Sequence, residues 1–129
     1  MTGALDGLVV LDFTQVLSGP FCTMMMADQG ARVIKIEPPG GDQTRKFGPF
    51  RKGQLTIEQG GYGGYFASTN RNKESIVVDL KSPAGRDVIK RLAGGADILV
   101  ENFRAGVMDR LGLGYDNGAI ARLQEHGIV

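Results

Sequence analysis

Cysteine and histidine are nearly absent from this sequence, which holds one residue of each, Cys22 and His126. A disulfide framework needs paired cysteines and a structural zinc site needs several Cys or His ligands, so the composition argues against both. His126 ends a predicted surface helix, where a cation suits the helix dipole, so we do not expect it to be catalytic. We expect no metal site.

Long apolar runs and an excess of one charge are also missing. No apolar run approaches the roughly 20 residues that a membrane-spanning helix needs. Asp6 and Asp12 stand where a secretory signal would carry a basic segment and an apolar stretch. Fifteen Lys and Arg nearly balance fourteen Asp and Glu, so the charge implies no affinity for nucleic acids. We expect a reduced, cytoplasmic protein with no membrane or nucleic-acid partner.

The amino-terminal part has the pattern of a strand, a helix and a second strand. Residues 8–11 form an apolar run too short for a helix, and Ser18 and Pro20 suit a helix N-cap and first turn. Residues 33–36 form a second β-rich run. This βαβ unit places residues 14–18 at the carboxyl end of a strand and at a helix N-terminus, where ligands and anions bind.

The rest of the chain continues this alternation and predicts an α/β fold, with enough length for one domain. Pro83 follows Ser82 as the first residue of a helix that Gly94 and Gly95 close. The further elements that we predict are a strand at 75–80, a strand at 97–101, a short helix at 106–111, a helix at 117–125 and a strand that begins at 128.

A long segment between the second and third strands lacks a regular pattern. Prolines and glycines at 38–41 end the second strand, and we predict a loop from about residue 43 to residue 65, followed by a short helical turn at 65–67. Loops of this length inside compact domains are usually functional. The segment either reaches over a site or a partner subunit, or is a mobile surface insertion.

Basic residues follow the predicted strand ends. Because the carboxyl ends of parallel strands meet at one edge of a sheet, Lys81, Arg104 and Arg110 are brought toward that edge. Lysine supplies a point charge and arginine a planar fork, and both bind phosphate groups. The alternative is that these residues are ordinary solvated charges.

Acidic residues near element ends suggest two other kinds of site. Glu37 ends the second strand, where a dinucleotide-binding protein has its ribose ligand, but residues 14–20 contain no Gly-x-Gly-x-x-Gly and the chain has no P-loop pattern. Asp12, Asp28 and Asp79 are candidate acids or nucleophiles. For Asp28 we expect a structural role.

Many short motifs are spaced over nearly the whole length of this chain. They are Leu5-Asp6-Gly7, Leu11-Asp12-Phe13-Thr14, Ser18-Gly19-Pro20, Ala27-Asp28-Gln29-Gly30-Ala31, Val33-Ile34-Lys35-Ile36-Glu37, Asn70-Arg71-Asn72-Lys73, Asp79-Leu80-Lys81-Ser82-Pro83-Ala84-Gly85, Val100-Glu101-Asn102-Phe103-Arg104-Ala105-Gly106 and Arg110-Leu111-Gly112. Together these motifs resemble one enzyme family, the class III (CaiB/BaiF) CoA-transferases, and the nearest well-known branch is the formyl-CoA transferases.

The resemblance implies a fold and an activity. Residues 1–129 would form the N-terminal part of a large, Rossmann-like domain with a parallel sheet and flanking helices. In this family CoA passes from an acyl-CoA to a carboxylic acid through covalent aspartyl intermediates, with no permanently bound cofactor. The aspartate lies in a segment after residue 129, so we expect no catalytic residue in this chain. Family members are interlocked homodimers.

The resemblance also implies which residues contact CoA. They are Leu17, Ser18, Val78, Asp79, Leu80, Lys81, Asn102, Phe103, Arg104 and Arg110. Formyl-CoA transferases have Gln where Leu17 stands and Arg where Pro38 stands, so formyl or oxalate specificity and one nucleotide contact do not carry over. A 2-methylacyl-CoA racemase of the same fold and an inactive CoA-binding fragment are the alternatives.

Overall fold

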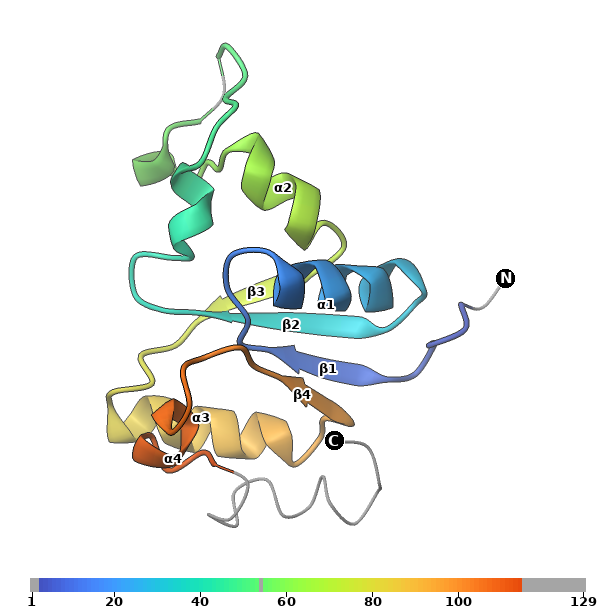
Figure 1. The fold of residues 1–129 in the computed structure, drawn as a ribbon, viewed down its shortest axis with the longest axis vertical. Helices are drawn as coiled ribbons and strands as arrows, with labels where there is room; N and C mark the ends of the chain where they lie inside the picture. Colours follow the sequence, from blue (N-terminus) through green and yellow to red (C-terminus); the bar gives the residue numbers. More distant parts are fainter. Residues whose placement is uncertain (1–2, 54, 115–129) are drawn as a thin grey trace.

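A parallel sheet occupies the centre of the structure, a computed structural model that describes residues 3–53 and 55–114 (Figure 1). Its strands are β1 (Val9–Asp12), β2 (Arg32–Glu37), β3 (Glu74–Val77) and β4 (Ile98–Val100), in the order β3-β2-β1-β4. The predicted α/β fold is confirmed.

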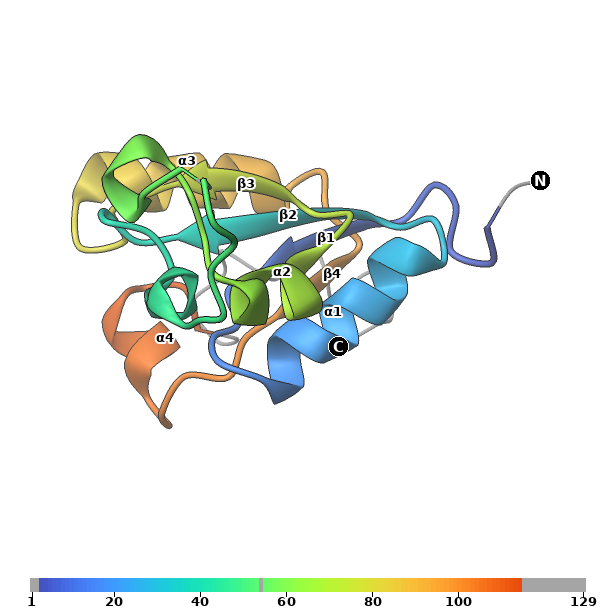
Figure 2. The same ribbon diagram turned by 90° about the horizontal axis from the view of Figure 1, so that it is seen from above.

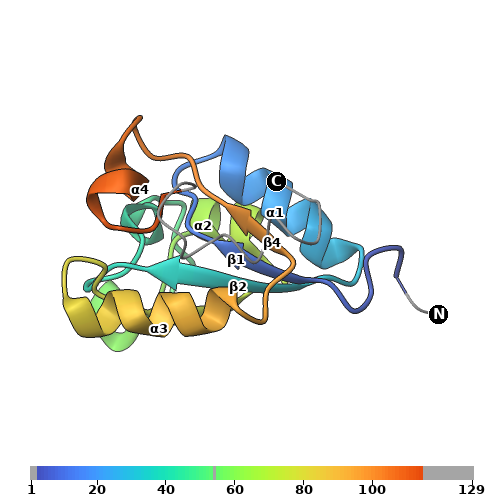
Figure 3. The same cartoon turned by 90° about the horizontal axis from the view of Figure 1, so that it is seen from below.

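The strand order places a crossover beside β1. The chain passes from β1 to β2 and β3 on one side, and then returns to β4 on the other side, where Leu11 pairs with Leu99. Helices α1 (Ser18–Asp28) and α2 (Gly64–Asn70) lie on one face of the sheet, and α3 (Pro83–Ala93) and α4 (Val107–Arg110) lie on the other (Figures 1 and 3). Open α/β sheets bind ligands at the carboxyl edge beside such a reversal.

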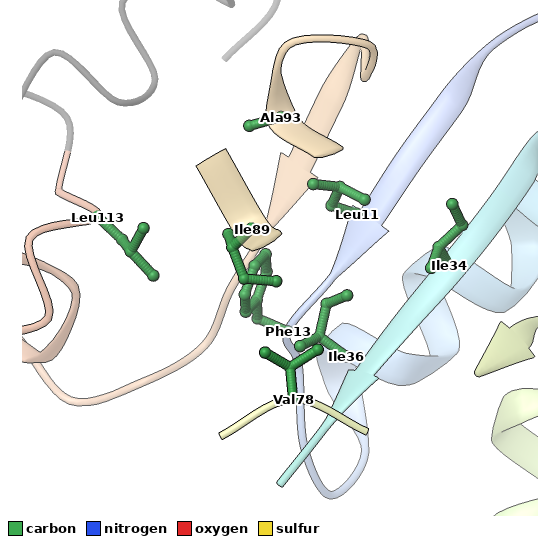
Figure 4. Close-up of a cluster of buried hydrophobic side chains, with 8 residues drawn as sticks. All are labelled: Leu11, Phe13, Ile34, Ile36, Val78, Ile89, Ala93 and Leu113. Atoms are coloured by element: carbon green, nitrogen blue, oxygen red, sulfur yellow. The ribbon is translucent and has the colours of Figure 1, made fainter. Parts of the chain in front are cut away.

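The face under α3 is apolar. Ile89 and Ala93 of α3 pack against Leu11 of β1 and Ile36 of β2, with Phe13 between them (Figure 4). Each fully buried side chain of this size stabilises the fold by about 1.5–3 kcal/mol. The remaining members of this buried cluster are Ile34, Val78 and Leu113.

Helix α3 begins as the sequence predicts. Ser82 Oγ accepts a hydrogen bond from the Gly85 N–H at 3.0 Å, and Pro83 is the first helical residue. A Cβ atom on Gly85 would lie 2.0 Å from the Asp79 carbonyl oxygen, so only glycine fits this tight strand-to-helix turn.

The predicted loop from 43 to 65 is partly wrong, because it contains two short 3₁₀ helices, η1 (Gln43–Lys46) and η2 (Ile57–Gln59). The predicted turn at 65–67 is the longer helix α2, which packs against α1 and η1 (Figure 2).

The remaining predictions concern strand β3, the C-terminal elements and membrane-spanning helices. Strand β3 is shorter than predicted, because after Val77 the chain turns toward α3. The predicted helix at 117–125, the strand at 128 and His126 lie outside the described residues. In the described part of the chain, no helix is long and apolar enough to cross a membrane.

Candidate functional site

A cavity of about 480 Å³ opens at the carboxyl edge of the sheet. The residues that line it come from the loop after β1, the end of β2, the β3–α3 turn, the loop after β4 and α4: Gln15, Ile36, Glu37, Pro38, Pro39, Val78, Asp79, Leu80, Lys81, Phe103, Val107 and Leu111. Its volume is within the usual range for small-molecule sites. The position is the one that the strand order favours for a ligand.

Five of the residues expected to contact CoA line this cavity: Val78, Asp79, Leu80, Lys81 and Phe103. The other five do not line it. Leu17, Ser18, Arg104 and Arg110 are exposed, and Asn102 is hydrogen-bonded to the main chain of Gln15.

Among the described residues that line this cavity, Lys81 alone has a cationic side chain. Its backbone N–H donates to Asp79 Oδ1 at 2.9 Å, which fixes the turn that precedes α3. The first turn of α3 follows directly, so Lys81 immediately precedes the positive end of an eleven-residue helix. This arrangement suits a phosphate group, and the apolar walls at Ile36, Leu80 and Phe103 suit a flat, weakly polar group.

Hydrogen bonds hold the loop after β1 on both sides. Asp12 Oδ1 accepts from the Thr14 N–H at 2.8 Å, and Lys35 Nζ donates to the Thr14 carbonyl at 2.8 Å. The Asn102 side chain accepts from the Gln15 N–H at 2.9 Å and donates to the Gln15 carbonyl at 2.8 Å.

The next residue, Val16, has a φ angle of +70°, in the left-handed region. For a β-branched residue this conformation is strained by roughly 1–3 kcal/mol. The Val16 side chain is 44% exposed, so little burial offsets the strain. The surrounding hydrogen bonds therefore hold the loop in this shape.

A buried ion pair lies beneath this loop. Lys73 Nζ donates to Asp12 Oδ2, the Pro20 carbonyl and Asn70 Oδ1, each at 2.9 Å. Burial raises the pKa of Asp12, but the ammonium groups of Lys73 and Lys35 together with hydrogen bonds from Thr14 and Thr23 outweigh burial and hold that pKa below its ordinary value. Burial lowers the pKa of Lys73, despite the opposing attraction of Asp12.

Two more buried ion pairs connect β2 to η1. Lys35 Nζ lies 3.0 Å from Asp42 Oδ2, and both side chains are at most 2% exposed. Arg45 donates to both Glu37 oxygens, at 2.7 and 2.6 Å. The Arg45 guanidinium carbon lies 4.0 Å from the Phe66 ring centroid, a cation–π contact.

The pKa of Glu37 shows how strongly this carboxylate is held. Burial raises its pKa, but hydrogen bonds from Arg45, Ser75 and the Asp42 backbone outweigh burial and lower the value from 4.5 to about 2. Since both Glu37 oxygens are occupied, the carboxylate does not offer the free acceptor that a dinucleotide ribose requires.

The candidate acids also have structural partners. Asp12 is fully buried and paired with Lys73. Asp28 is paired with Arg71 and accepts from Asn72, as the structural interpretation predicts. Asp79 is exposed at the cavity and accepts from the Lys81 N–H.

A second cavity, of about 300 Å³, lies beside α2 and is lined by Lys35, Arg45, Arg71 and Lys73 among others. Each of these cations is already paired with a carboxylate. This cavity therefore offers an anion little uncompensated charge, and the cavity at Lys81 is the stronger candidate.

Sequence reasoning missed some lining residues, including Gln15, Pro39, Val107 and Leu111, and the whole buried ionic network. One signal for the network was present. Lys35 and Glu37 alternate with Ile34 and Ile36 on a strand that has to be buried on both faces. Charges at such positions require buried partners.

Comparisons with known proteins match most of this chain. A family model described as CoA-transferase family III matches residues 5–121. The chain is 48% identical over 124 residues to a succinyl-CoA:mesaconate CoA-transferase from Haloarcula hispanica, covering 96% of this chain and 29% of that protein. It is 49% identical over 117 residues to a formyl-CoA:oxalate CoA-transferase from Rhodopseudomonas palustris, covering 90% of this chain and 26% of that protein.

A solved structure is also similar to this chain. A CAIB/BAIF family protein from Brucella suis matches with a TM-score of 0.81 and 38% identity, over 91% of this chain and 30% of that chain. The chain thus spans less than a third of the length of these relatives.

Proposed function

This chain belongs to CoA-transferase family III, and from that premise we propose that it is part of an enzyme that transfers CoA from an acyl-CoA to a carboxylic acid. The relatives named above act on mesaconate and oxalate. Because both of these acids carry two carboxylates, we propose a dicarboxylic acid as the acceptor here.

The cavity at the carboxyl edge is the proposed site for the nucleotide part of CoA. The observation that carries this proposal is the position of Lys81, beside the first turn of α3 and at the mouth of an otherwise mainly apolar cavity. Lys81 and the helix N-terminus would hold a phosphate, and Phe103 would stack on the adenine. Leu17, Ser18, Arg104 and Arg110 are proposed as contacts for the parts of CoA that extend outside the cavity.

The remaining features of the proposal follow the family resemblance. The catalytic aspartate would lie outside residues 1–129. CoA would be bound as a substrate and not as a permanent cofactor, and the enzyme would be a cytoplasmic, interlocked homodimer.

Calorimetric titration of the 129-residue chain with CoA tests the site. Lys81→Ala should weaken binding by about tenfold or more, because it removes a charge-assisted contact. Lys90→Ala, which removes an exposed lysine from the last turn of the same helix, is the matched control and should leave the affinity unchanged. Equal binding by all three proteins would remove Lys81 from the site.

Incubation with a panel of acyl-CoA donors and acids, followed by mass spectrometry, tests the reaction in a protein of the relatives' length that contains this chain. Exchange of CoA between donor and acid is the expected result. Racemisation of a 2-methylacyl-CoA without exchange would instead support the racemase alternative.

A further inference from the structure

The loop between β1 and α1 has a backbone shape that its own sequence disfavours. Val16 is a β-branched residue at a φ of +70°, and its side chain is 44% exposed. The helix that follows has no side-chain N-cap, so local hydrogen bonds from a capping residue do not explain the shape. The cause has to lie in the residues packed around the loop.

Asn102 makes the most direct contact with this loop. Its Oδ1 accepts from the Gln15 N–H at 2.9 Å and its Nδ2 donates to the Gln15 carbonyl at 2.8 Å. One side chain thus binds both main-chain polar groups of the residue before Val16. On the other side, Lys35 Nζ donates to the Thr14 carbonyl. The main chain that enters Val16 is therefore fixed from β2 and from the segment after β4.

We propose that Asn102 is a positioning residue, which keeps Val16 in the left-handed conformation and thereby directs the Gln15 side chain into the CoA cavity. This inference rests on the proposed function for the cavity, which Gln15 lines and Asn102 does not. Because the Asn102 amide binds both main-chain polar groups of Gln15, we attribute its effect on CoA binding to the loop. CoA then binds to a loop that already has its bound conformation in the free protein.

A thermal double-mutant cycle tests this coupling without any ligand. Val16→Gly should raise the unfolding midpoint by roughly 2–5 °C, because glycine adopts a positive φ without strain. In the Asn102→Ala background the loop is free to relax, so Val16→Gly should give no such gain. The matched control is Asn72→Gly, since Asn72 also has a positive φ, of +63°, but lies elsewhere. Its effect should be the same with and without Asn102.

CoA affinity supplies the second readout. Asn102→Ala should weaken binding by about tenfold, and adding Val16→Gly should restore most of that loss, because glycine lets the loop reach its bound shape without the clamp. Loss of a direct contact to CoA would not be rescued in this way. If Asn102→Ala does not fold, Asn102→Asp keeps the acceptor for the Gln15 N–H and replaces the donor by a carboxylate oxygen that repels the Gln15 carbonyl.

The outcomes separate the two proposals. Additive thermal effects of the Val16 and Asn102 substitutions, or an affinity loss that Val16→Gly does not rescue, overturn the positioning role. Absence of CoA binding by the wild-type chain contradicts the proposed site, and in that case the thermal cycle alone decides whether Asn102 holds Val16.

Discussion

Lys73 shows how a single charged residue can organise this fold. Its ammonium group has three acceptors, which come from β1, from the first turn of α1 and from the end of α2. Its side chain is 2% exposed and that of Asp12 is 0% exposed. A buried ion pair of this kind contributes little compared with an apolar pair, but removal of one partner leaves the other charge without compensation.

Lys73→Met should therefore destabilise the protein by about 3–5 kcal/mol, measured by urea denaturation. The double variant Lys73→Met with Asp12→Asn should recover a large part of this loss, because no unpaired charge remains. Lys90→Met, at an exposed position, is the control and should change stability by less than about 0.5 kcal/mol. A loss for Lys73→Met no larger than that of the control would show that Asp12 is not buried as a charge.

At the scale of elements, the segment between β2 and β3 depends on Glu37. This carboxylate, at the end of β2, receives Arg45 from η1, Ser75 from β3 and the backbone N–H of Asp42. Charge and hydrogen bonds therefore attach this segment to the sheet at Glu37. Such an attachment depends on pH.

The pKa of Glu37 sets the pH range of this dependence. Since folding lowers it from 4.5 to about 2, Glu37 contributes stability that is fully present above pH 4.5 and is lost as the pH falls toward 2. The contribution is on the order of 3 kcal/mol. Thermal unfolding is measured from pH 7 to pH 2. The unfolding temperature of Glu37→Gln should fall less steeply with pH than that of the wild type. The control Glu101→Gln, which replaces an exposed carboxylate, should follow the wild type. Identical slopes in all three proteins would contradict this role for Glu37.

Some helices and strands could be predicted from the sequence, and others could not. Caps and short apolar runs are local signals, so the helix that starts at Pro83 and the strands near residues 8–11 and 33–36 were predicted close to their observed bounds. Helix α2 and the two 3₁₀ helices are short, and tertiary contacts such as that of Arg45 with Phe66 stabilise them. Periodicity in the sequence does not report such contacts.

The candidate site also contains residues that local sequence signals indicate and residues that only tertiary contacts bring in. Of the residues that the family motifs indicated, the turn at residues 78–81 and Phe103 line the cavity, because these residues follow strands at the same edge of the sheet. Gln15 and Leu111 reach the cavity only because the β1 loop, held by Asn102, and α4 fold over the edge. For every residue of the predicted CoA site, contact with CoA stays a prediction.

At the scale of the whole molecule, the two faces of the sheet have different chemistry. Ile34 and Ile36 of β2 pack in the apolar cluster under α3, while Lys35 and Glu37 bind Asp42 and Arg45. Adjacent residues of a strand point to opposite faces, so this division follows directly from the sequence of β2. The face under α3 is apolar. The opposite face combines a second apolar cluster, around Val10 and Val33, with the charges that hold the loop beside the cavity.

The last prediction is that the 129-residue chain, by itself, does not transfer CoA. Covalent transfer through a carboxylate needs that group aligned with the thioester, and a misplacement of about 1 Å can lower the rate roughly a hundredfold. Asp12 is buried in its ion pair and Asp28 is bound to Arg71, so neither is available. Asp79 reaches the cavity, but its Oδ1 already accepts from the Lys81 N–H.

The measurement is incubation of purified chain with succinyl-CoA and isotope-labelled dicarboxylic acids, followed by mass spectrometry, with one of the named relatives as the positive control. We expect product formation no faster than in buffer, even where calorimetry shows that CoA is bound. Asp79→Asn and Asp28→Asn form the discriminating pair, because only Asp79 lines the cavity. Turnover that is lost in Asp79→Asn and kept in Asp28→Asn would contradict the prediction and identify Asp79 as the nucleophile.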